Sequence, residues 1–157
     1  MAYWRMQLHP DQSSEAVRHA VQSLAAGYIG LDFVTDVGDL RRTKWDQLPP
    51  KQKPYWAFVG EMVEGDTVLV VVHQWPFALV TVDGDYNYIR TRTPEIGVWF
   101  RHFRKVKDVK YYADYKTNAH EWTRLKMTDT ICPLRKDDTA SRQLIEEWLE
   151  SVSPVAA

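Results

Sequence analysis

The stretch GDTVLVVVHQWPFALVTV, from Gly65 to Val82, predicts the centre of the fold. A Gly-Asp turn leads into one apolar run, Val68 to Val72, and a second run, Phe77 to Val82, follows after a short break. Both runs are rich in β-branched residues, which favour strands, so we expect two adjacent strands in the core. Trp75 lies in the connection, where we expect its large ring to edge a pocket rather than fill the sheet.

Hydrophobic periodicity extends this prediction along the chain. Trp4, Met6 and Leu8 alternate with polar residues in YWRMQL, as in a half-buried strand. Further strands are expected at GYIGLDFV, DGDYNYI and GVWFRHFRKVK. Three helices are expected: one around Tyr55 to Met62, one in Ser141 to Ser151, and one whose apolar positions are Val17, Ala20, Val21, Leu24 and Ala25. This order indicates an α+β domain in which a small, bent or barrel-like sheet has helices packed outside.

The segment GVWFRHFRKVK, Gly97 to Lys107, mixes aromatic and basic residues. If it were one regular strand, neither of its faces would be cleanly apolar. We therefore expect a bulge or a strong bend near Arg101 to Arg104, with the aromatic residues anchoring the sheet and the cations pointing outward.

Composition limits the classes of function. The 157 residues, 45% of them hydrophobic, suffice for one core, so we expect a single domain at 1–151 and a tail or linker at 152–157. The 20 basic residues balance 21 acidic ones, so binding of nucleic acid must depend on local clusters. The apolar runs are too short for a membrane span and the N-terminal segment lacks the pattern of a signal peptide, so we expect a cytoplasmic protein.

Catalytic and metal-binding patterns are sparse. The lone Cys132 excludes an internal disulfide, and the histidines are scattered without metal-ligand spacing, so we expect no metal and no cofactor. One pattern is enzyme-like: Asp108 and Lys110, with Asp83 or Asp85, resemble the acidic and lysine groups with which many nucleases hold a metal and polarise a phosphate. A solvated, lysine-rich surface explains the same residues, and a metal-dependent nuclease remains an alternative.

Aromatic and basic residues carry more information. Seven Trp and eight Tyr exceed what the core needs, because both types carry polar groups that require partners when they are buried. An exposed aromatic face can stack on a base, and Trp45 combines such a face with the neighbouring cations Arg41, Arg42 and Lys44.

The order of these segments resembles a known family. YWRMQLHP, a helix, GYIGLDF, EGDTVLVVV, FALVTVDGDYNYI and GVWFRHFRKVK together look like the EVE-type branch of the PUA-like superfamily. They are similar in particular to the EVE-like and YTH-like DNA-binding modules at the N-termini of McrB-type modification-dependent (type IV) restriction proteins. The resemblance spans about Tyr3 to Leu134 and implies a PUA-like, EVE-type small bent β-barrel flanked by helices.

The resemblance also implies a function. It predicts a non-catalytic module that binds DNA containing a methylated base, of the 5-methylcytosine type or N6-methyladenine, by flipping that base into an aromatic pocket. Its partners would be further domains or subunits of a restriction complex that the module directs to foreign DNA. An RNA-binding PUA-like domain is a further alternative.

The resemblance places the site at named residues. The modified-base pocket is expected at Gln7, His9, Tyr28, Asp32, Phe33 and Trp75. Asp32 would accept a hydrogen bond from the exocyclic amine of cytosine or adenine, although a surface acid near a turn is an equal alternative. Phe33 stands where the YTH pattern has Trp, which leaves the choice of modification open. Contacts to the DNA backbone are expected from Arg41, Arg42, Lys44, Trp45, Arg90, Arg92, Arg101, Arg104 and Lys105.

Overall fold

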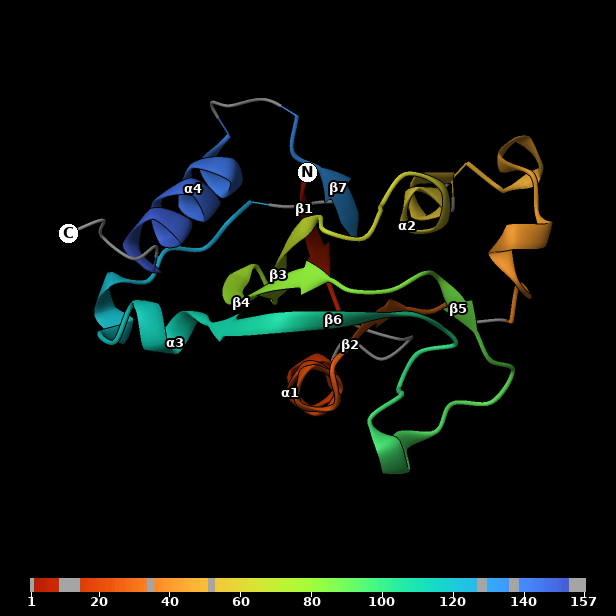
Figure 1. Ribbon diagram of the computed structural model, residues 1–157, viewed down its shortest axis with the longest axis horizontal. Helices are drawn as coiled ribbons and strands as arrows, with labels where there is room; N and C mark the ends of the chain where they lie inside the picture. Colours follow the sequence, from red (N-terminus) through yellow and green to blue (C-terminus); the bar gives the residue numbers. More distant parts are fainter. Residues whose placement is uncertain are drawn as a thin grey trace.

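A hairpin forms the centre of the computed structural model, which describes residues 2–8, 15–33, 36–50, 53–126, 130–135 and 139–152 (Figure 1). Strands β3 (Thr67–Val72) and β4 (Trp75–Val82) are antiparallel, and His73 and Gln74 between them both have positive φ. Such two-residue turns match the twist of the flanking strands. The two adjacent core strands are thus confirmed, with β4 beginning at Trp75.

A curled, mixed sheet of seven strands surrounds this hairpin. Its order is β2-β6-β4-β3-β1-β7, with β5 paired to β6, and β1 runs parallel to β3 while the other pairs are antiparallel. The remaining strands are β1 (Tyr3–Gln7), β2 (Tyr28–Leu31), β5 (Asn87–Tyr88), β6 (His102–Tyr111) and β7 (Ile131–Pro133). The sheet is a half-barrel with β2 and β7 at its ends, so the α+β class and the bent sheet are confirmed.

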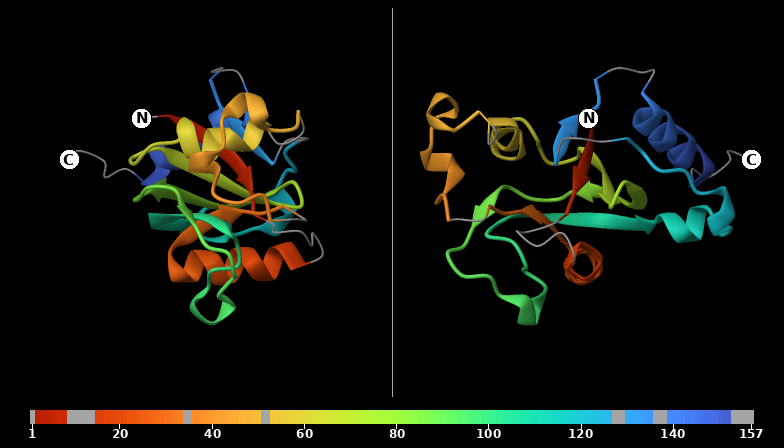
Figure 2. Two further views of the ribbon diagram at one scale, coloured as in Figure 1. Left: turned by 90° about the vertical axis from the view of Figure 1, so that its right-hand side faces the viewer. Right: turned by 180° about the vertical axis from the view of Figure 1, so that it is seen from behind.

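Helices cover both faces of the sheet (Figures 1 and 2). The helix α1 (Ala16–Ala26) packs on one face and α4 (Ala140–Val152) on the other. Strand β3 is buried on both faces, since Val68 and Val70 lie in the core with α1 and Leu69 lies in the core with α4. Its unbroken apolar run follows from this double burial. The short helices are α2 (Ala57–Gly60), α3 (Tyr112–Tyr115), and the 3-10 turns η2 (Leu40–Arg42), η3 (Trp45–Gln47), η4 (Lys53–Trp56), η5 (Pro94–Ile96) and η6 (Ala119–Glu121).

The buried face of α1 differs from the expected one. Ala20 and Leu24 are buried as expected, whereas Val17, Val21 and Ala25 are exposed. His19 and Ser23 are buried instead, because the loop between β5 and β6 packs against the helix. The His19 ring lies 4.4 Å from that of Trp99, and Ser23 Oγ donates to the Gly97 carbonyl at 3.1 Å. Partners from a distant loop therefore turn two polar residues inward.

Strand β6 is more regular than the sequence indicated. Its inward residues are His102, Arg104 and Val106, in strict alternation, and the register shifts only later, where Asp108 has a φ of 51°. The bulge expected near Arg101 to Arg104 is therefore wrong in position and lies about four residues further on. Two polar residues at the start of β6 face the interior.

Within the described part of the chain, no helix is both long and apolar enough to cross a membrane.

Candidate nucleic-acid interface

Three aromatic rings contact the buried imidazole of His102 at the start of β6, and a fourth ring packs on one of the three. We call Phe33, Tyr55, Tyr86, Tyr88 and His102 the His102 cluster. The rings of Phe33, Tyr88 and Tyr86 lie 5.3, 5.3 and 5.8 Å from the imidazole, and Tyr55 lies 5.2 Å from Phe33. The pairing of β5 with β6 sets Tyr88 opposite His102. The cluster thus joins β2, η4, β5 and β6 at one end of the sheet.

Burial makes His102 a neutral ring. Desolvation is the largest influence on it and lowers the pKa of His102 to about 4, against the opposing pull of the nearby carboxylates of Asp32 and Asp36. Its Nδ1 is hydrogen-bonded to the Tyr86 hydroxyl. Burial also raises the pKa of Tyr86, so both partners of this bond are uncharged at neutral pH.

The Asp32 carboxylate lies beside the cluster with a fully buried side chain. Oδ2 accepts from Nε of Arg92 at 2.7 Å and from the backbone N–H of Arg101 at 3.2 Å. Oδ1 accepts from the Phe33 N–H at 2.8 Å and from the Arg101 guanidinium at 3.3 Å. A carboxylate has about four acceptor positions, and these four donors occupy them.

A polar rim with both signs of charge borders the cluster. The Tyr88 hydroxyl donates to both oxygens of Asp36, at 2.6 and 2.7 Å, which lowers the pKa of Asp36 and raises that of Tyr88. The Arg41 guanidinium lies 5.4 Å from the centre of the Tyr86 ring and pairs with Asp39 at 2.8 Å. Aromatic faces and guanidinium groups are therefore interleaved on this side of the molecule.

The structure brings together only part of the expected pocket. Asp32 and Phe33 lie in or beside the His102 cluster, and Gln7 at the end of β1 reaches it indirectly. The Gln7 N–H donates to the Thr130 carbonyl at 2.8 Å, and the Thr130 hydroxyl is 3.1 Å from that of Tyr55. His9 lies outside the described residues.

Tyr28 and Trp75 are separated from this site. Tyr28 packs edge-to-face on Phe103 at 5.4 Å, and Phe103 alternates with His102, so both rings face the opposite side of the sheet. Trp75 begins β4, in which Ala78 pairs with Tyr111 at the far end of β6. Asp32 follows Leu31, which pairs with His102 at the start of β6. A ten-residue strand is about 30 Å long, so the expected grouping of Trp75 with Asp32 is wrong.

The cations expected at the DNA backbone fall into three groups. Arg41, Arg42, Lys44, Arg90 and Lys105 are exposed, while Arg92 and Arg101 are half-buried and paired with Asp32. Arg104 is buried: its guanidinium donates to the carbonyls of Phe58, Val59, Met62 and Gly84. The expectation that Arg104 contacts phosphate is therefore wrong in this fold, because backbone carbonyls occupy its donors. The Trp45 side chain lies outside the described part of the structure.

Two residues of the nuclease alternative, Asp108 and Lys110, lie in the second half of β6, while Asp83 and Asp85 follow β4. Asp108 is exposed at the bulge, Lys110 is half-buried, and Asp83 pairs with Lys107 at 3.5 Å. The described residues contain no group of three His, Cys, Asp or Glu that could hold a metal ion.

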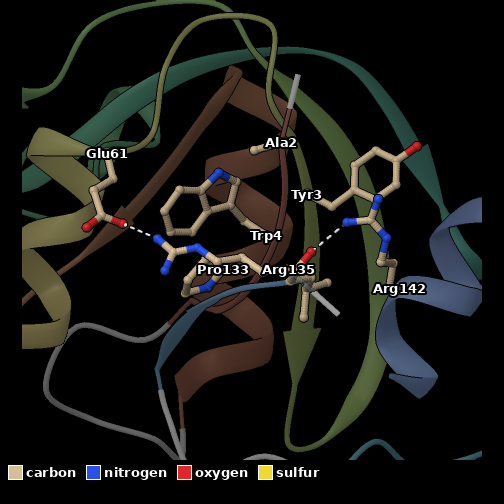
Figure 3. A pocket seen from close by; sticks show the side chains of 8 residues that line it. Ala2, Tyr3, Trp4, Glu61, Pro133, Arg135 and Arg142 are labelled. Atoms are coloured by element: carbon tan, nitrogen blue, oxygen red, sulfur yellow. Dashed lines mark hydrogen bonds and ion pairs between the residues drawn. The ribbon is translucent and has the colours of Figure 1, made fainter. Parts of the chain in front are cut away.

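Two hollows lie elsewhere on the molecule. Trp75 lines an apolar hollow of about 200 Å³ together with Val17, Phe77 and Trp122, so its expected place at the edge of a pocket is confirmed. A larger cleft of about 540 Å³ lies near the N-terminus (Figure 3). Its cations are engaged within the protein. Arg135 pairs with Glu61 at 3.1 Å, and Arg142 donates to the Leu134 carbonyl at 2.6 Å beside the Tyr3 ring.

Sequence reasoning missed Tyr55, Tyr86, Tyr88, Asp36 and His102 as members of the site. One signal was present in DGDYNYI, since Tyr86 and Tyr88 are two residues apart and therefore face the same side of an extended segment. His102 gave no comparable signal, because a histidine in a basic strand is typical of a solvated face.

No protein-family model matches the chain, and no curated protein matches it in sequence. Among solved structures, the chain is similar to the YTH domain of the Zygosaccharomyces rouxii MRB1 protein, which was crystallised in complex with N6-methyladenosine RNA. The two share 11% sequence identity, and the match covers 94% of this chain and 86% of the YTH chain with a TM-score of 0.45.

Proposed function

We propose that the chain is a non-catalytic DNA-binding module that recognises a methylated base, flipped out of its stack into the His102 cluster. The observation that carries this proposal is the contact of Phe33, Tyr86 and Tyr88 with one buried, neutral imidazole. Tyr55 extends this group of rings by packing on Phe33. Flipping costs a few kcal/mol, which stacking on aromatic faces and hydrogen bonds to the base edge can offset.

The charges beside the cluster suit a nucleic acid. Arg41 and Arg90 lie close enough to influence the tyrosines of the cluster, and both are exposed. A phosphate near these groups would gain from their charge without being read for sequence. Asp32 holds Arg92 and Arg101 next to the same rings, so in this proposal it anchors these two cations rather than reading the base.

The biological role in this proposal is to direct a McrB-like restriction complex to foreign DNA. Support comes from the sequence pattern of the EVE-like modules, whose order of segments the chain follows. The test is the plating efficiency of a phage with methylated DNA and of the same phage with unmodified DNA. Host cells would carry the whole reading frame that encodes this chain. Selective loss of plaques from the methylated phage is expected, and equal plating contradicts the restriction role.

A binding panel tests the recognition itself. Otherwise identical duplexes would carry unmodified bases, 5-methylcytosine, 5-hydroxymethylcytosine, N4-methylcytosine or N6-methyladenine, and an RNA strand with N6-methyladenosine would be the further arm. One methylated duplex should bind about ten-fold to a hundred-fold more tightly than the unmodified one, as expected for a methyl group in an apolar pocket. Equal affinities across the duplexes contradict the proposal, and tighter binding of the RNA strand would assign the module to RNA.

Two matched substitutions locate the pocket. Phe33→Leu removes a ring from the His102 cluster, and Trp75→Leu removes one from the distant apolar hollow. We expect Phe33→Leu to lose the preference for the methylated duplex and Trp75→Leu to keep it, with circular dichroism showing that both variants fold. The reverse result would move the site to Trp75.

A further inference from the structure

The Nε2 atom of His102 is buried and has no hydrogen-bond partner among the described residues. The whole residue is 0% exposed, so bulk water does not serve as that partner. A buried polar atom without a partner is costly, and most buried polar atoms in folded proteins are satisfied. A base can become that partner only by displacing one of the rings that pack on His102, namely Phe33, Tyr86 or Tyr88, because the free chain leaves Nε2 unexposed.

The partners of Tyr86 decide which nitrogen of His102 carries the proton. The Tyr86 oxygen accepts a hydrogen bond from the Leu40 N–H at 3.1 Å, and its remaining partner among the described residues is His102 Nδ1. The hydroxyl proton therefore points to Nδ1, which must act as an acceptor. A neutral imidazole whose Nδ1 accepts carries its proton on Nε2. Nε2 is thus a donor, and it points away from Tyr86.

We propose that His102 is the specificity-determining residue of the site, donating from Nε2–H to an acceptor atom, a ring nitrogen or a carbonyl oxygen, on the edge of the flipped base. This inference rests on the proposed function and names the group that performs the recognition. The four acceptor positions of Asp32 are already occupied, whereas His102 has a donor to spare. A donor fixed in this way selects a base that presents an acceptor and rejects one that presents an N–H at the same place.

The first test observes the wild-type chain without any substitution. Nitrogen-15 NMR of labelled histidine, recorded in the free chain, should show His102 protonated at Nε2 and not at Nδ1. Saturation with the duplex that binds best in the panel should move the Nε2–H proton resonance downfield and slow its exchange with water. An Nε2 without a proton in the free chain overturns the inference. A duplex that leaves the Nε2–H resonance unchanged also overturns the inference, and would indicate that Nε2–H donates to an ordered water and not to the base.

The second test compares two substitutions at the same position. His102→Phe removes the donor, and we expect the affinity for the methylated duplex to fall by about ten-fold. His102→Gln keeps one acceptor for Tyr86 and one donor for the base, so it should bind within about three-fold of the wild type if it folds.

The outcomes separate this inference from the proposed function. A wild-type chain that prefers a methylated duplex while His102→Phe binds it equally well overturns the role of His102 and leaves the module a reader of methylated bases. A wild-type chain that binds no duplex of the panel overturns both.

Discussion

Oδ2 of Asp32 accepts a 2.7 Å hydrogen bond from Nε of Arg92, and this contact fastens the loop before β6 to the end of β2. Arg101 adds two further bonds to the same carboxylate from the other end of that loop. Because the loop also packs on α1 through Trp99, the Asp32 carboxylate fixes the positions of Arg92 and Arg101 relative to the His102 cluster. A single buried charge therefore organises one side of the site.

The substitution Asp32→Asn should destabilise the fold. The neutral amide would leave two half-buried guanidinium groups without their anion, and we expect a loss of about 2 kcal/mol in the free energy of unfolding, less than for a wholly buried pair because both arginines retain some contact with water. Urea unfolding measures this loss. Asp114→Asn, at an exposed position in α3, is the control and should change the midpoint little. Equal midpoints for the two variants would contradict the anchoring role of Asp32.

Arg104 should matter for stability and not for binding. Arg104→Met keeps the apolar stem but removes the donors to the carbonyls of α2 and its surroundings, so we expect a loss of about 3 kcal/mol. Arg104→Lys should rescue little of it, since an ammonium group cannot reproduce a planar fork of donors. The control is Lys105→Met, at the exposed neighbouring position. Unfolding curves of the three variants compare these losses, and a fully stable Arg104→Met would show that the carbonyls find other donors.

The depressed pKa of His102 makes stability depend on pH. Burial holds the pKa at about 4 in the folded chain, against about 6.5 when the ring is exposed, while Asp32, Asp36 and Asp39 oppose the shift and Arg101 reinforces it. Between these two values the unfolded chain binds a proton that the folded chain does not bind. The contribution of the neutral His102 ring to the free energy of unfolding is therefore complete above about pH 6.5. It falls by about 3 kcal/mol as the pH decreases to about 4.

Unfolding at about pH 7 and about pH 4.5 measures this dependence. His102→Gln should lose less stability on acidification than the wild type does. His120→Gln, which changes an exposed histidine, should behave like the wild type. If His102→Gln and the wild type lose the same amount, the ring is not held neutral.

Gly30 in β2 leaves no room for a side chain. A Cβ added there would lie 2.6 Å from the His102 carbonyl oxygen and 2.6 Å from the Phe100 Cβ, so β2 and the segment leading into β6 would have to separate. We expect Gly30→Ala to cost about 2 kcal/mol or more in the free energy of unfolding, with weaker binding because the cluster spans both strands. Gly84→Ala is the matched control, since its nearest neighbour would be the Lys105 side chain at 3.3 Å. Similar stabilities for the two variants would mean that β2 can move without cost.

The central hairpin was predictable because its signal is local. Six consecutive residues of β3 are buried, and their β-branched character favours a strand before any tertiary contact forms. The inward direction of His102 and Arg104 was not predictable in this way. Their partners are Tyr86 and the carbonyl of Phe58, which lie 16 and 46 residues away in the sequence. Burial of a polar side chain depends on such partners, and hydrophobic alternation alone assigns it to the solvent.

The site shows the same limit. Asp32 was singled out because a carboxylate can accept from the exocyclic amine of a base, yet its carboxylate is occupied by donors that include Arg92, 60 residues later. Trp75 was grouped with Asp32 because the family resemblance implied one pocket formed by both, but the pairing of β4 with β6 sets them at opposite ends of the sheet. Residue type and strand order identified good candidates, while register decided which of them meet.

The dependence of binding on salt should reveal which cations contact phosphate. Each contact that is lost lowers the slope of log affinity against log salt by about 0.9. Arg42 follows Arg41 in η2, Arg90 lies near enough to act on Tyr88, and both are exposed, so we expect Arg42→Gln and Arg90→Gln each to lower the slope by about that amount for methylated and unmodified duplexes alike. Arg124→Gln is the control, because Arg124 lies over Trp75 in the distant hollow. Fluorescence anisotropy titrations at several salt concentrations measure the slopes, and a change confined to Arg124→Gln would place the DNA over the Trp75 end of the sheet.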